Sequence, residues 1–404
     1  MRCQFCSSEK TQQFLDLGNH PPCIFLTQPE LKDEKAYPLN AHYCPDCGLI
    51  QLGTLVPQEI LFGDNYHHIA ALSASFKAHL SELAENCSKR FKLGSQDLAI
   101  DLGSNDGALL EAFKARGVKV LGVDPSDIAQ MAIDKGLPTI RDFFNEALAA
   151  KIVKEHGKAK VMTALNTFAH VSSLDSFVRG INAVLTDDGV FVSENHYALD
   201  LMSGLQYDFI YHEHSRYYTV RHLVALFARF GMEVFDVERI ATHSGSIRVF
   251  AGKKGAHPVS KVVAGPLAEE EAFGLSKADT YKAFATKVTE HKKGFVEMLR
   301  GIKAKGQRIM GLTFPARAVT LLNFCGIGPE TLDAITEGSA IKIGRYSPGN
   351  HIKVVDQDVL FGKDAPEYGL LLSWHIQKEI VPKFRAKGFK GKFIIPLPTP
   401  TIID

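Results

Sequence analysis

The spacing of apolar residues divides the chain into parts with different predicted structure. Residues 1–60 show little helical periodicity and are rich in turn formers such as Pro, Gly and Asn. Six apolar residues then recur at the spacing of one helix face, which predicts an amphipathic helix: Leu72, Phe76, Leu80, Leu83, Cys87 and Phe91. From residue 97 to about 255, strand patterns alternate with helical patterns, which predicts βαβ units and a parallel sheet.

The strand patterns of this region are 98–102, 118–124, 160–166, 190–195, 232–240 and 247–253. The last two lie close together with no helical pattern between them, which predicts an antiparallel hairpin at one edge of the sheet.

A second alternating region follows a connector at 256–278 and a long helical pattern at about 279–304. Its strand patterns are 308–313, 352–356, 368–374 and 393–398. The Gly- and Pro-containing stretch 326–351 supports no assignment. The predicted fold class is α/β, with a small lobe at 1–70, a Rossmann-like domain at 71–260 and a second Rossmann-like domain at 261–404.

Composition narrows the class of protein. The chain has 404 residues, 46 Lys and Arg against 45 Asp and Glu, and 45% hydrophobic residues. The net charge of +1 is not that of an electrostatic nucleic-acid or membrane binder. No apolar run approaches the roughly 20 residues of a membrane span, and the first residues lack the apolar stretch of a secretion signal. We expect a soluble cytoplasmic protein, and the oligomeric state stays open.

Five of the seven cysteines lie in the first 47 residues, and four of them form two CxxC pairs. Two such pairs supply the four thiolates of a closed structural zinc site, with Cys3, Cys6, Cys44 and Cys47 as ligands. The alternatives are a redox CxxC, which normally belongs to a thioredoxin-like unit that is missing here, or free buried cysteines. Cys23 is expected to be a small buried apolar side chain.

The first strand of the alternating region runs into a Gly-punctuated loop, in the pattern Asp-x-Gly-x-x-x-Gly. A carboxylate at this point would repel a diphosphate but suits the cationic aminoacyl end of S-adenosylmethionine (SAM). Asp124, at the end of the next strand, suits the two ribose hydroxyls. The alternative is a strand and loop that bind nothing. The predicted SAM site comprises Asp101, Gly103, Asn105, Gly107, Asp124 and Asn166.

Residues 211–218, Tyr-His-Glu-His-Ser-Arg-Tyr-Tyr, form the densest polar and aromatic segment. Three interpretations are open: a metal-binding His pair, a base assembly in which Glu213 supports His214, or a surface loop. His170 and Asn195 follow strands of the same sheet, so they are expected at the same edge as the SAM loop.

The order of these motifs resembles the SAM-dependent sugar C-methyltransferases that build branched deoxysugars. The resemblance covers nearly the whole chain. Besides the CxxC pairs, it rests on 103–107, 166–171, 211–214, 243–248, 321–326, 344–349 and 393–396.

This resemblance implies a zinc lobe, a class I SAM-methyltransferase sheet and a C-terminal Rossmann-like domain that helps enclose a nucleotide-linked 4-keto sugar. It implies that His214 is the general base, with Glu213 beside it, and that Tyr211 and His170 line the reacting carbon and ketone. The resemblance also implies that Tyr66 contributes to the active site. The residues assigned to substrate binding are Asn195, His243, Ser246, Arg317, Arg345 and His351.

Two segments depart from the family pattern. His67 and His68 replace part of a Tyr- and Ser-rich segment, and the Gly-rich loop at 311–320 loses glycine and has Arg317 where relatives have Lys. Both departures concern the choice of substrate more than the fold.

The expected activity is methyl transfer to C3 of an NDP-4-keto sugar through a base-generated enolate. The alternatives are an epimerase or O-methyltransferase with the same base chemistry, or a SAM-fold protein without turnover. The sequence identifies neither the nucleotide nor the sugar nor the pathway.

Overall fold

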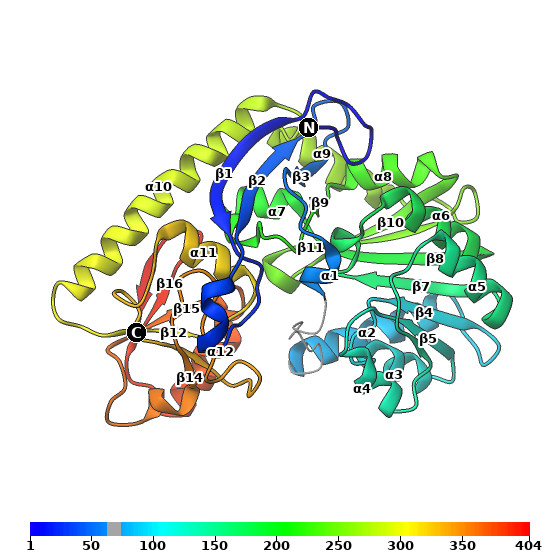
Figure 1. The fold of residues 1–404 in the computed structure, drawn as a ribbon. Coiled ribbons are helices and arrows are strands. Elements are labelled where there is room, and N and C mark those ends of the chain that lie inside the picture. The colour runs from blue at the N-terminus through cyan, green and yellow to red at the C-terminus, as the bar shows by residue number, and fades with distance from the viewer. Residues whose placement is uncertain (63–73) are drawn as a thin grey trace.

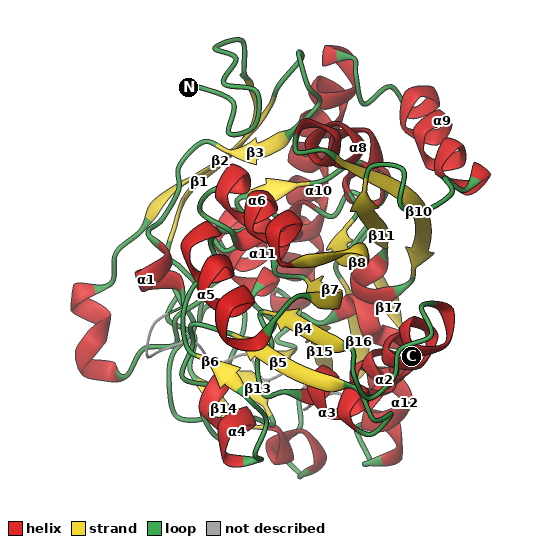
Figure 2. Cartoon of the chain, turned by 90° about the vertical axis from the view of Figure 1, so that its right-hand side faces the viewer, coloured by secondary structure: helices red, strands yellow, loops and turns green. Residues whose placement is uncertain are grey.

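The computed structural model describes residues 1–62 and 74–404, which form three sheets with helices packed around them (Figures 1 and 2). The first sheet is antiparallel, with strand order β1-β2-β3-β9. Its strands are β1 (Gln12–His20), β2 (Tyr37–Tyr43), β3 (Ile50–Leu52) and β9 (Arg216–Tyr217). The short helices η1 (Gln28–Asp33) and α1 (Gln58–Leu61) complete this part. The fourth strand therefore comes from a distant part of the sequence.

The second sheet has seven strands in the order β10-β11-β8-β7-β4-β5-β6. They are β4 (Leu98–Leu102), β5 (Lys119–Val123), β6 (Thr139–Ile140), β7 (Ala159–Leu165), β8 (Leu185–His196), β10 (Met232–Ile240) and β11 (Ser246–Lys253). β4 to β8 are parallel, whereas β10 and β11 form an antiparallel hairpin at the edge. The predicted parallel sheet with an edge hairpin is confirmed, and the two-residue strand β6 was not predicted.

Helices cover both faces of this sheet. They are α2 (Ala74–Arg90), α3 (Ala108–Lys114), α4 (Ala129–Asp134), α5 (Glu146–His156), α6 (Leu174–Val184), α7 (Ala198–Ser203) and α8 (Val220–Arg229). Single turns lie at η3 (Phe168–His170), η4 (Tyr207–Phe209) and η5 (Thr242–Ser244). The side chains of Val190 and Val192 in β8 belong to the hydrophobic cluster that also contains α2. Phe191, between them, belongs to the other cluster, which contains α5 and α6. The alternation follows from the two-residue period of a strand buried on both sides.

The third sheet has six strands in the order β14-β13-β12-β15-β16-β17. They are β12 (Ile309–Leu312), β13 (Ile335–Glu337), β14 (Val354–Asp356), β15 (Tyr368–Leu371), β16 (Lys392–Ile395) and β17 (Thr401–Ile403), and only β17 among these six is antiparallel. The helices are α10 (Ala278–Lys303), α11 (Arg317–Cys325) and α12 (Gln377–Ala386), with single turns η7 (Gln357–Phe361) and η8 (Trp374–Ile376). The long helix α10 runs from the N-terminal strands to the C-terminal sheet (Figure 1).

Two segments contain elements that the sequence did not predict. The connector 256–278 holds η6 (Lys261–Val263) and α9 (Ala264–Phe273), and the unassigned stretch 326–351 holds β13. Glu270 of α9 is buried and accepts hydrogen bonds from the Tyr197 hydroxyl at 2.7 Å and from the amides of Val220 and Arg221. α9 thus caps the start of α8, a long-range contact without a sequence signal. We propose domain boundaries near residues 70 and 260, as the sequence predicts.

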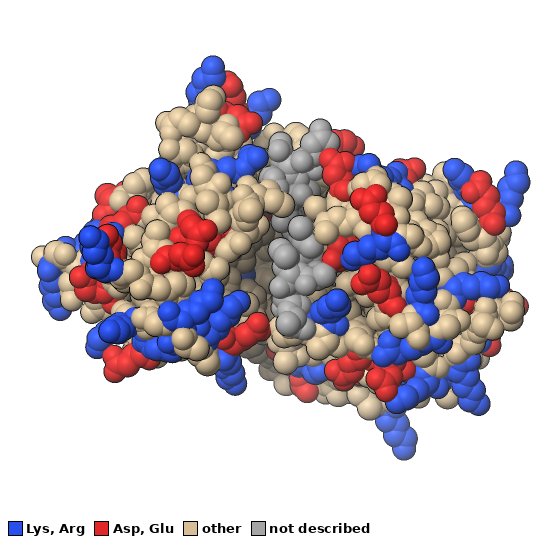
Figure 3. All heavy atoms as spheres, turned by 90° about the horizontal axis from the view of Figure 1, so that it is seen from below, with Lys and Arg blue, Asp and Glu red and all other residues tan. Residues whose placement is uncertain are grey.

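Among the described residues, no helix combines the length and apolar character needed to cross a membrane. Basic and acidic side chains are intermixed over the face in Figure 3, in keeping with the net charge of +1.

Candidate active site

Two carboxylates lie at the ends of neighbouring strands of the central sheet. Asp101 of β4 is buried, and the Thr163 hydroxyl of β7 donates to its Oδ1 at 2.6 Å. Burial raises the pKa of Asp101 to about 7; the Thr163 hydrogen bond opposes this, and the charge of Asp124 adds to it. Asp124 follows β5, which pairs with β4 in parallel. This pair of acids favours a cationic group at the sheet edge.

Asp124 also organises the loop between β4 and α3. Its Oδ2 accepts the amide of Asn105 at 2.8 Å, and its Oδ1 accepts the amide and hydroxyl of Ser126 at 2.9 and 2.5 Å. Gly103, Asn105 and Gly107 all have positive φ angles. A Cβ on Gly103 would lie 2.1 Å from Thr167 Oγ1, so glycine is needed there for close approach. The loop therefore holds its backbone against the carboxyl edge of the sheet.

Asn166 connects this loop region to the next strand. It follows β7 with a φ of 54°, and its amide donates to the Glu194 carbonyl of β8 at 2.7 Å. The next residues of β8 are Asn195 and His196. Within the described part of the chain, the Asn195 carboxamide is buried and neither its Oδ1 nor its Nδ2 has a partner. A buried amide of this kind is a candidate ligand contact.

Tyr211 and His214 form a hydrogen-bonded pair beside His170. The Tyr211 hydroxyl and His214 Nε2 are 2.8 Å apart, and the His170 and His214 ring centroids are 4.8 Å apart. His170 Nδ1 donates to the Glu213 carbonyl, which leaves Nε2 as the ring nitrogen with a lone pair. His170 follows β7, the parallel neighbour of β4, so these two imidazoles and the phenol lie beyond the carboxyl end of the sheet that carries Asp101.

The ring of Phe209 lies at the centre of a larger group of polar side chains. The His196 ring stacks on it with the two ring centroids 3.7 Å apart. The centroids of the His214 and His243 rings lie 4.8 and 6.2 Å from the Phe209 centroid. The Arg317 guanidinium carbon lies 4.8 Å from the same ring. His243 in turn stacks on His375 at 6.3 Å.

The imidazoles of His170, His196, His214 and His375 are uncharged at neutral pH. Burial lowers the pKa of His196, His214 and His375 well below the usual range, and the positive charge of Arg317 lowers each further. Burial also lowers the pKa of His170. Neutral imidazoles near a fixed cation can accept protons, and they would gain basicity if an anion entered.

Arg317 is itself buried in a polar junction between the central and C-terminal sheets. Its Nε and Nη2 donate to the Asp208 carboxylate at 2.8 and 2.7 Å, and the Trp374 indole donates to the same carboxylate at 2.8 Å. The guanidinium lies between the rings of Phe209 and Trp374. Its Nη1 is buried and has no hydrogen-bond partner among the described residues, so one donor is left for a ligand.

Glu213 precedes His214 in the chain, and its side chain is buried beside the Tyr211–His214 pair. Burial raises the pKa of its carboxyl group to about 7, while the amides of Glu213 itself and Cys23 lower it. Among the described residues, no hydrogen bond joins the Glu213 carboxyl group to His214. The link to the site is instead its main-chain carbonyl, which holds His170.

The four predicted zinc ligands come together in the N-terminal lobe. One ligand atom from each of Cys3, Cys6, Cys44 and Cys47 lies within 4.8 Å of the others. The Sγ atoms of Cys3 and Cys47 are 3.5 Å apart, and those of Cys6 and Cys44 are 3.6 Å apart. Zn–S bonds of about 2.3 Å in a tetrahedron require S–S separations of roughly 3.8 Å, so zinc fits this site.

Comparisons with known proteins agree with this geometry. Family models match residues 3–62 ("Putative zinc binding domain"), 76–237 ("Methyltransferase domain") and 241–398 ("C-methyltransferase C-terminal domain"). The C-methyltransferase NovU of Streptomyces niveus is 32% identical over 409 residues, which cover 100% of this chain and 96% of NovU.

The chain belongs to the C-methyltransferase family. This C-methyltransferase uses SAM as its methyl donor and binds zinc in its N-terminal lobe.

Solved structures resemble part of the C-methyltransferase. A SAM-dependent methyltransferase from Clostridium acetobutylicum is 15% identical, with a TM-score of 0.36, and the match covers 46% of this chain and 94% of that one. Magnesium protoporphyrin IX methyltransferase from Synechocystis is 14% identical, with a TM-score of 0.34, over 44% of this chain and 83% of that one.

Three of the residues assigned to substrate binding have other partners in the C-methyltransferase. The Ser246 hydroxyl donates to the Thr242 carbonyl and closes the turn that carries His243. Arg345 donates to the Phe25 carbonyl, and His351 pairs with Glu34 at 2.7 Å. Arg345 and His351 thus join the N-terminal lobe to the C-terminal domain. Of the remaining three, His243 and Arg317 lie beside the Phe209 ring, and Asn195 is the buried residue before His196, which stacks on that ring. Tyr66, and the departures at His67 and His68, lie outside the described residues.

Three polar residues near the site were not singled out by the sequence analysis. His79 contacts the buried Glu194 at 2.8 Å, and His375 stacks on His243. Asp208 carried no signal, because its Arg317 partner lies far away in the sequence. His222, in contrast, is fully buried against Phe5 and Tyr218.

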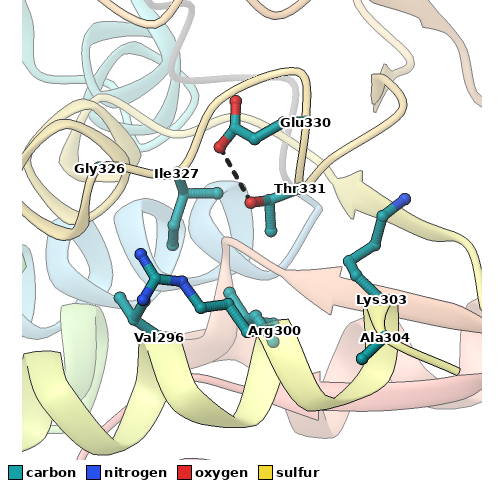
Figure 4. Close-up of a pocket in the computed structure, with 9 residues that line it drawn as sticks. Val296, Arg300, Lys303, Ala304, Gly326, Ile327, Glu330 and Thr331 are labelled. Atoms are coloured by element: carbon teal, nitrogen blue, oxygen red, sulfur yellow. Dashed lines mark hydrogen bonds between the residues drawn. The ribbon is translucent and has the colours of Figure 1, made fainter.

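A separate cavity of about 330 Å³ lies between α10 and the loop after α11. It is lined by Val296, Arg300 and Lys303 on one side and by Ile327 and Glu330 on the other, where the Thr331 hydroxyl donates a hydrogen bond to the Glu330 carboxylate (Figure 4). None of the predicted site residues lines it, so it is distinct from the candidate active site.

Replacing Cys44 by Ser is expected to reduce bound zinc from one ion per chain to nearly none. Structural zinc supplies roughly 10 kcal/mol or more of folding free energy in small sites, so the N-terminal lobe should unfold at lower temperature. Metal analysis by mass spectrometry, with thermal melting, checks both. Cys23→Ala is the matched control because Cys23 is outside the ligand set, and it should retain zinc. Freshly purified native protein without zinc would contradict this assignment.

Proposed function

We propose that the enzyme methylates C3 of a nucleotide-linked 4-keto sugar through a base-generated enolate. The observation that carries the proposal is the Tyr211–His214 hydrogen bond beside His170, at the same sheet edge as the SAM loop. A C–H bond next to a ketone is acidic enough for a neutral histidine to break. C-methylation requires this step, because the carbon must gain electron density before it can accept a methyl group.

His214 is the proposed base. Its imidazole is neutral because burial and nearby positive charge lower its pKa, so its lone pair is available at neutral pH. In this proposal His214 Nε2–H donates to the Tyr211 oxygen at 2.8 Å, so His214 Nδ1 carries the lone pair that takes up the C3 proton. The Tyr211 hydroxyl then donates its own hydrogen to the developing enolate oxygen. His170, whose ring centroid lies 4.8 Å from that of His214, is the rival base. We expect Glu213 to act on the pair through the carbonyl that holds His170.

The nucleotide diphosphate is proposed to lie near Arg317. The buried Nη1 of Arg317 lacks a partner among the described residues, and burial together with the Arg317 charge keeps the nearby imidazoles of His196 and His375 neutral. An anion in this position would accept a charge-assisted hydrogen bond from Nη1. Asn195, with its unpartnered carboxamide, is a further proposed contact for the sugar.

SAM is proposed to lie against Asp101, the 103–107 loop, Asp124 and Asn166. Bound SAM supplies an electrophilic methyl group on a sulfonium. The chain's own contribution is charge and position: Asp101 faces the cationic aminoacyl end, and Asp124 keeps the loop in place while presenting oxygens to the ribose. Gly103 allows backbone to approach closely.

SAM affinity is expected to weaken as the pH falls from 8 to 6. The pKa of Asp101 is raised to about 7, so its carboxylate is mostly charged at pH 8 and mostly protonated at pH 6. A cationic ligand prefers the charged form, and the loss approaches tenfold per pH unit below 7. Calorimetry at several pH values measures it. Asp101→Asn should bind SAM more weakly and without this pH dependence; an unchanged pH dependence in Asp101→Asn would assign it to another group.

Asp124→Ala is expected to weaken SAM binding by about 1–3 kcal/mol, the range for hydrogen bonds to a charged group. The substitution removes the ribose acceptor and the anchor of the Asn105 amide. Calorimetric titration with SAM gives the change. Asp134→Ala, at an exposed acid on α4, serves as the control and should bind SAM normally. Equal affinities for SAM in both variants would contradict the placement of the cofactor.

The substrate class is tested by thermal shift and turnover against a panel of dTDP-, GDP- and CDP-linked 4-keto sugars. We expect one nucleotide to stabilise the enzyme and its keto sugar to be methylated on carbon. Stabilisation by free sugars and by none of the nucleotides would contradict a nucleotide-linked substrate.

A further inference from the structure

We propose that the zinc lobe holds the catalytic segment 211–217 in position through a strand that the two share. The zinc site would thus support the chemistry as well as the fold of its own lobe. The structural part stands on backbone and side-chain contacts; its catalytic consequence rests on the proposed role of His214.

The shared strand is β9, which begins two residues after His214. β9 is the fourth strand of the zinc-lobe sheet, although it belongs to the middle of the chain. It pairs antiparallel with β3, and the Leu52 amide donates to the Ser215 carbonyl at 2.9 Å. Figure 1 shows β3 and β9 side by side above the central sheet. The residue after the proposed base is therefore hydrogen-bonded to the zinc lobe.

A second set of contacts connects β3 to the cysteines. The Gln51 side chain is fully buried; its Oε1 accepts the Gln4 amide at 2.8 Å, and its Nε2 donates to the Arg2 carbonyl at 3.3 Å. Gln4 lies between the zinc ligands Cys3 and Cys6, and its own side chain donates to the Leu52 carbonyl at 3.2 Å. The other ligand pair, Cys44 and Cys47, lies in the turn between β2 and β3. There the Cys44 amide donates to the carbonyl of Leu49, the residue before β3, at 2.9 Å.

On its other side the segment is fixed to the turn that carries His170. The Arg216 guanidinium donates to the carbonyls of Val171 and Ser172. The Ser215 amide and hydroxyl both donate to the Ala169 carbonyl, at 3.1 and 2.7 Å. Both imidazoles of the site are therefore positioned relative to β9, and β9 is positioned by β3.

Two residues of strand cannot hold this arrangement alone, because so short a pairing has little stability of its own. When zinc is lost, the Cys3–Cys6 turn loosens, Gln51 loses its anchored partner and β3 no longer fixes β9. The SAM site should be spared, since Asp101 and Asp124 belong to the separate central sheet.

The test is amide hydrogen exchange on the full-length enzyme with zinc bound and after its removal by a chelator. We expect peptides covering 50–52 and 211–217 to exchange at least about tenfold faster without zinc, while the central strand β7 stays protected. SAM affinity, measured by calorimetry on the same samples, should be unchanged while kcat falls. Unchanged exchange at 211–217, or faster exchange only together with β7, would overturn the proposal.

A variant tests the connection without removing the metal ligands. Gln51→Leu keeps the buried volume but loses the hydrogen bonds to the Cys3–Cys6 turn, and Gln13→Leu is the matched control at an exposed position of the same sheet. We expect faster exchange at 211–217 in Gln51→Leu alone, with kcat lowered and SAM affinity retained. Equal exchange in the two variants would overturn the proposed connection. Because exchange needs no substrate, failure of the proposed reaction and failure of this inference are distinguishable.

Discussion

Replacing His214 by Gln is expected to abolish both methyl transfer and exchange of the substrate's C3 proton with solvent, while leaving the fold and SAM binding intact. The loss should be about 10²–10⁴-fold, the usual contribution of a general base. Glutamine is similar in size and keeps a polar group near the Tyr211 hydroxyl, which His214 Nε2 contacts at 2.8 Å. What it lacks is a nitrogen lone pair that can take up a proton.

Proton exchange in D2O, followed by NMR of the keto sugar, measures the base step separately from methyl transfer. The control is His156→Gln, an exposed histidine at the end of α5, which should exchange and methylate normally. If exchange survives in His214→Gln and disappears in His170→Gln, the role of base belongs to His170.

Replacing Arg317 by Leu is expected to destabilise the junction between the central and C-terminal domains by about 3 kcal/mol. Among the described residues, the substitution leaves the buried Asp208 carboxylate with one hydrogen-bond donor, the Trp374 indole at 2.8 Å. Removing one partner of a buried ion pair typically costs 3–5 kcal/mol, because the other charge stays buried and uncompensated. It also removes the donor proposed for the diphosphate, so nucleotide binding should weaken.

Trp374 provides a direct probe because it is the single tryptophan of the chain and contacts this junction. Its fluorescence change in urea should move to a midpoint about 1–2 M lower in Arg317→Leu. Arg300→Leu, at an exposed position of α10, is the control and should unfold like the native enzyme. A native midpoint in Arg317→Leu would show that the Asp208 pair does not stabilise the junction.

The sequence predicted the elements whose signal is local. β4 was placed at its observed residues, and the helix predicted from Leu72 to Phe91 agrees with the described helix Ala74–Arg90. Each has several apolar residues at a regular spacing and a clear turn at its end. β9 and β13 were missed because strands of two and three residues are too short to show an alternating pattern of apolar and polar residues. Their positions depend instead on pairing with distant strands.

The candidate site also contains residues that a local motif predicts and residues that only the fold brings together. The four cysteines and the Asp101 loop could be found because their residues stand at diagnostic spacings within one motif. Asp208 could not be predicted, because its partner Arg317 is distant in the sequence and only folding brings the two together. Arg345 and His351 were assigned from motif order, but their partners, Phe25 and Glu34, lie in the N-terminal lobe. Motif order places a residue in the family pattern but does not show which partner its side chain meets.

The central claim is tested most directly by incubating the enzyme with SAM labelled with ¹³C in its methyl group and an NDP-4-keto sugar, followed by NMR of the product. The account predicts a ¹³C methyl group bonded to C3, the carbon next to the ketone, and no such product from His214→Gln. A labelled methyl group on oxygen, or SAM consumed with no methyl group on the sugar, would contradict it.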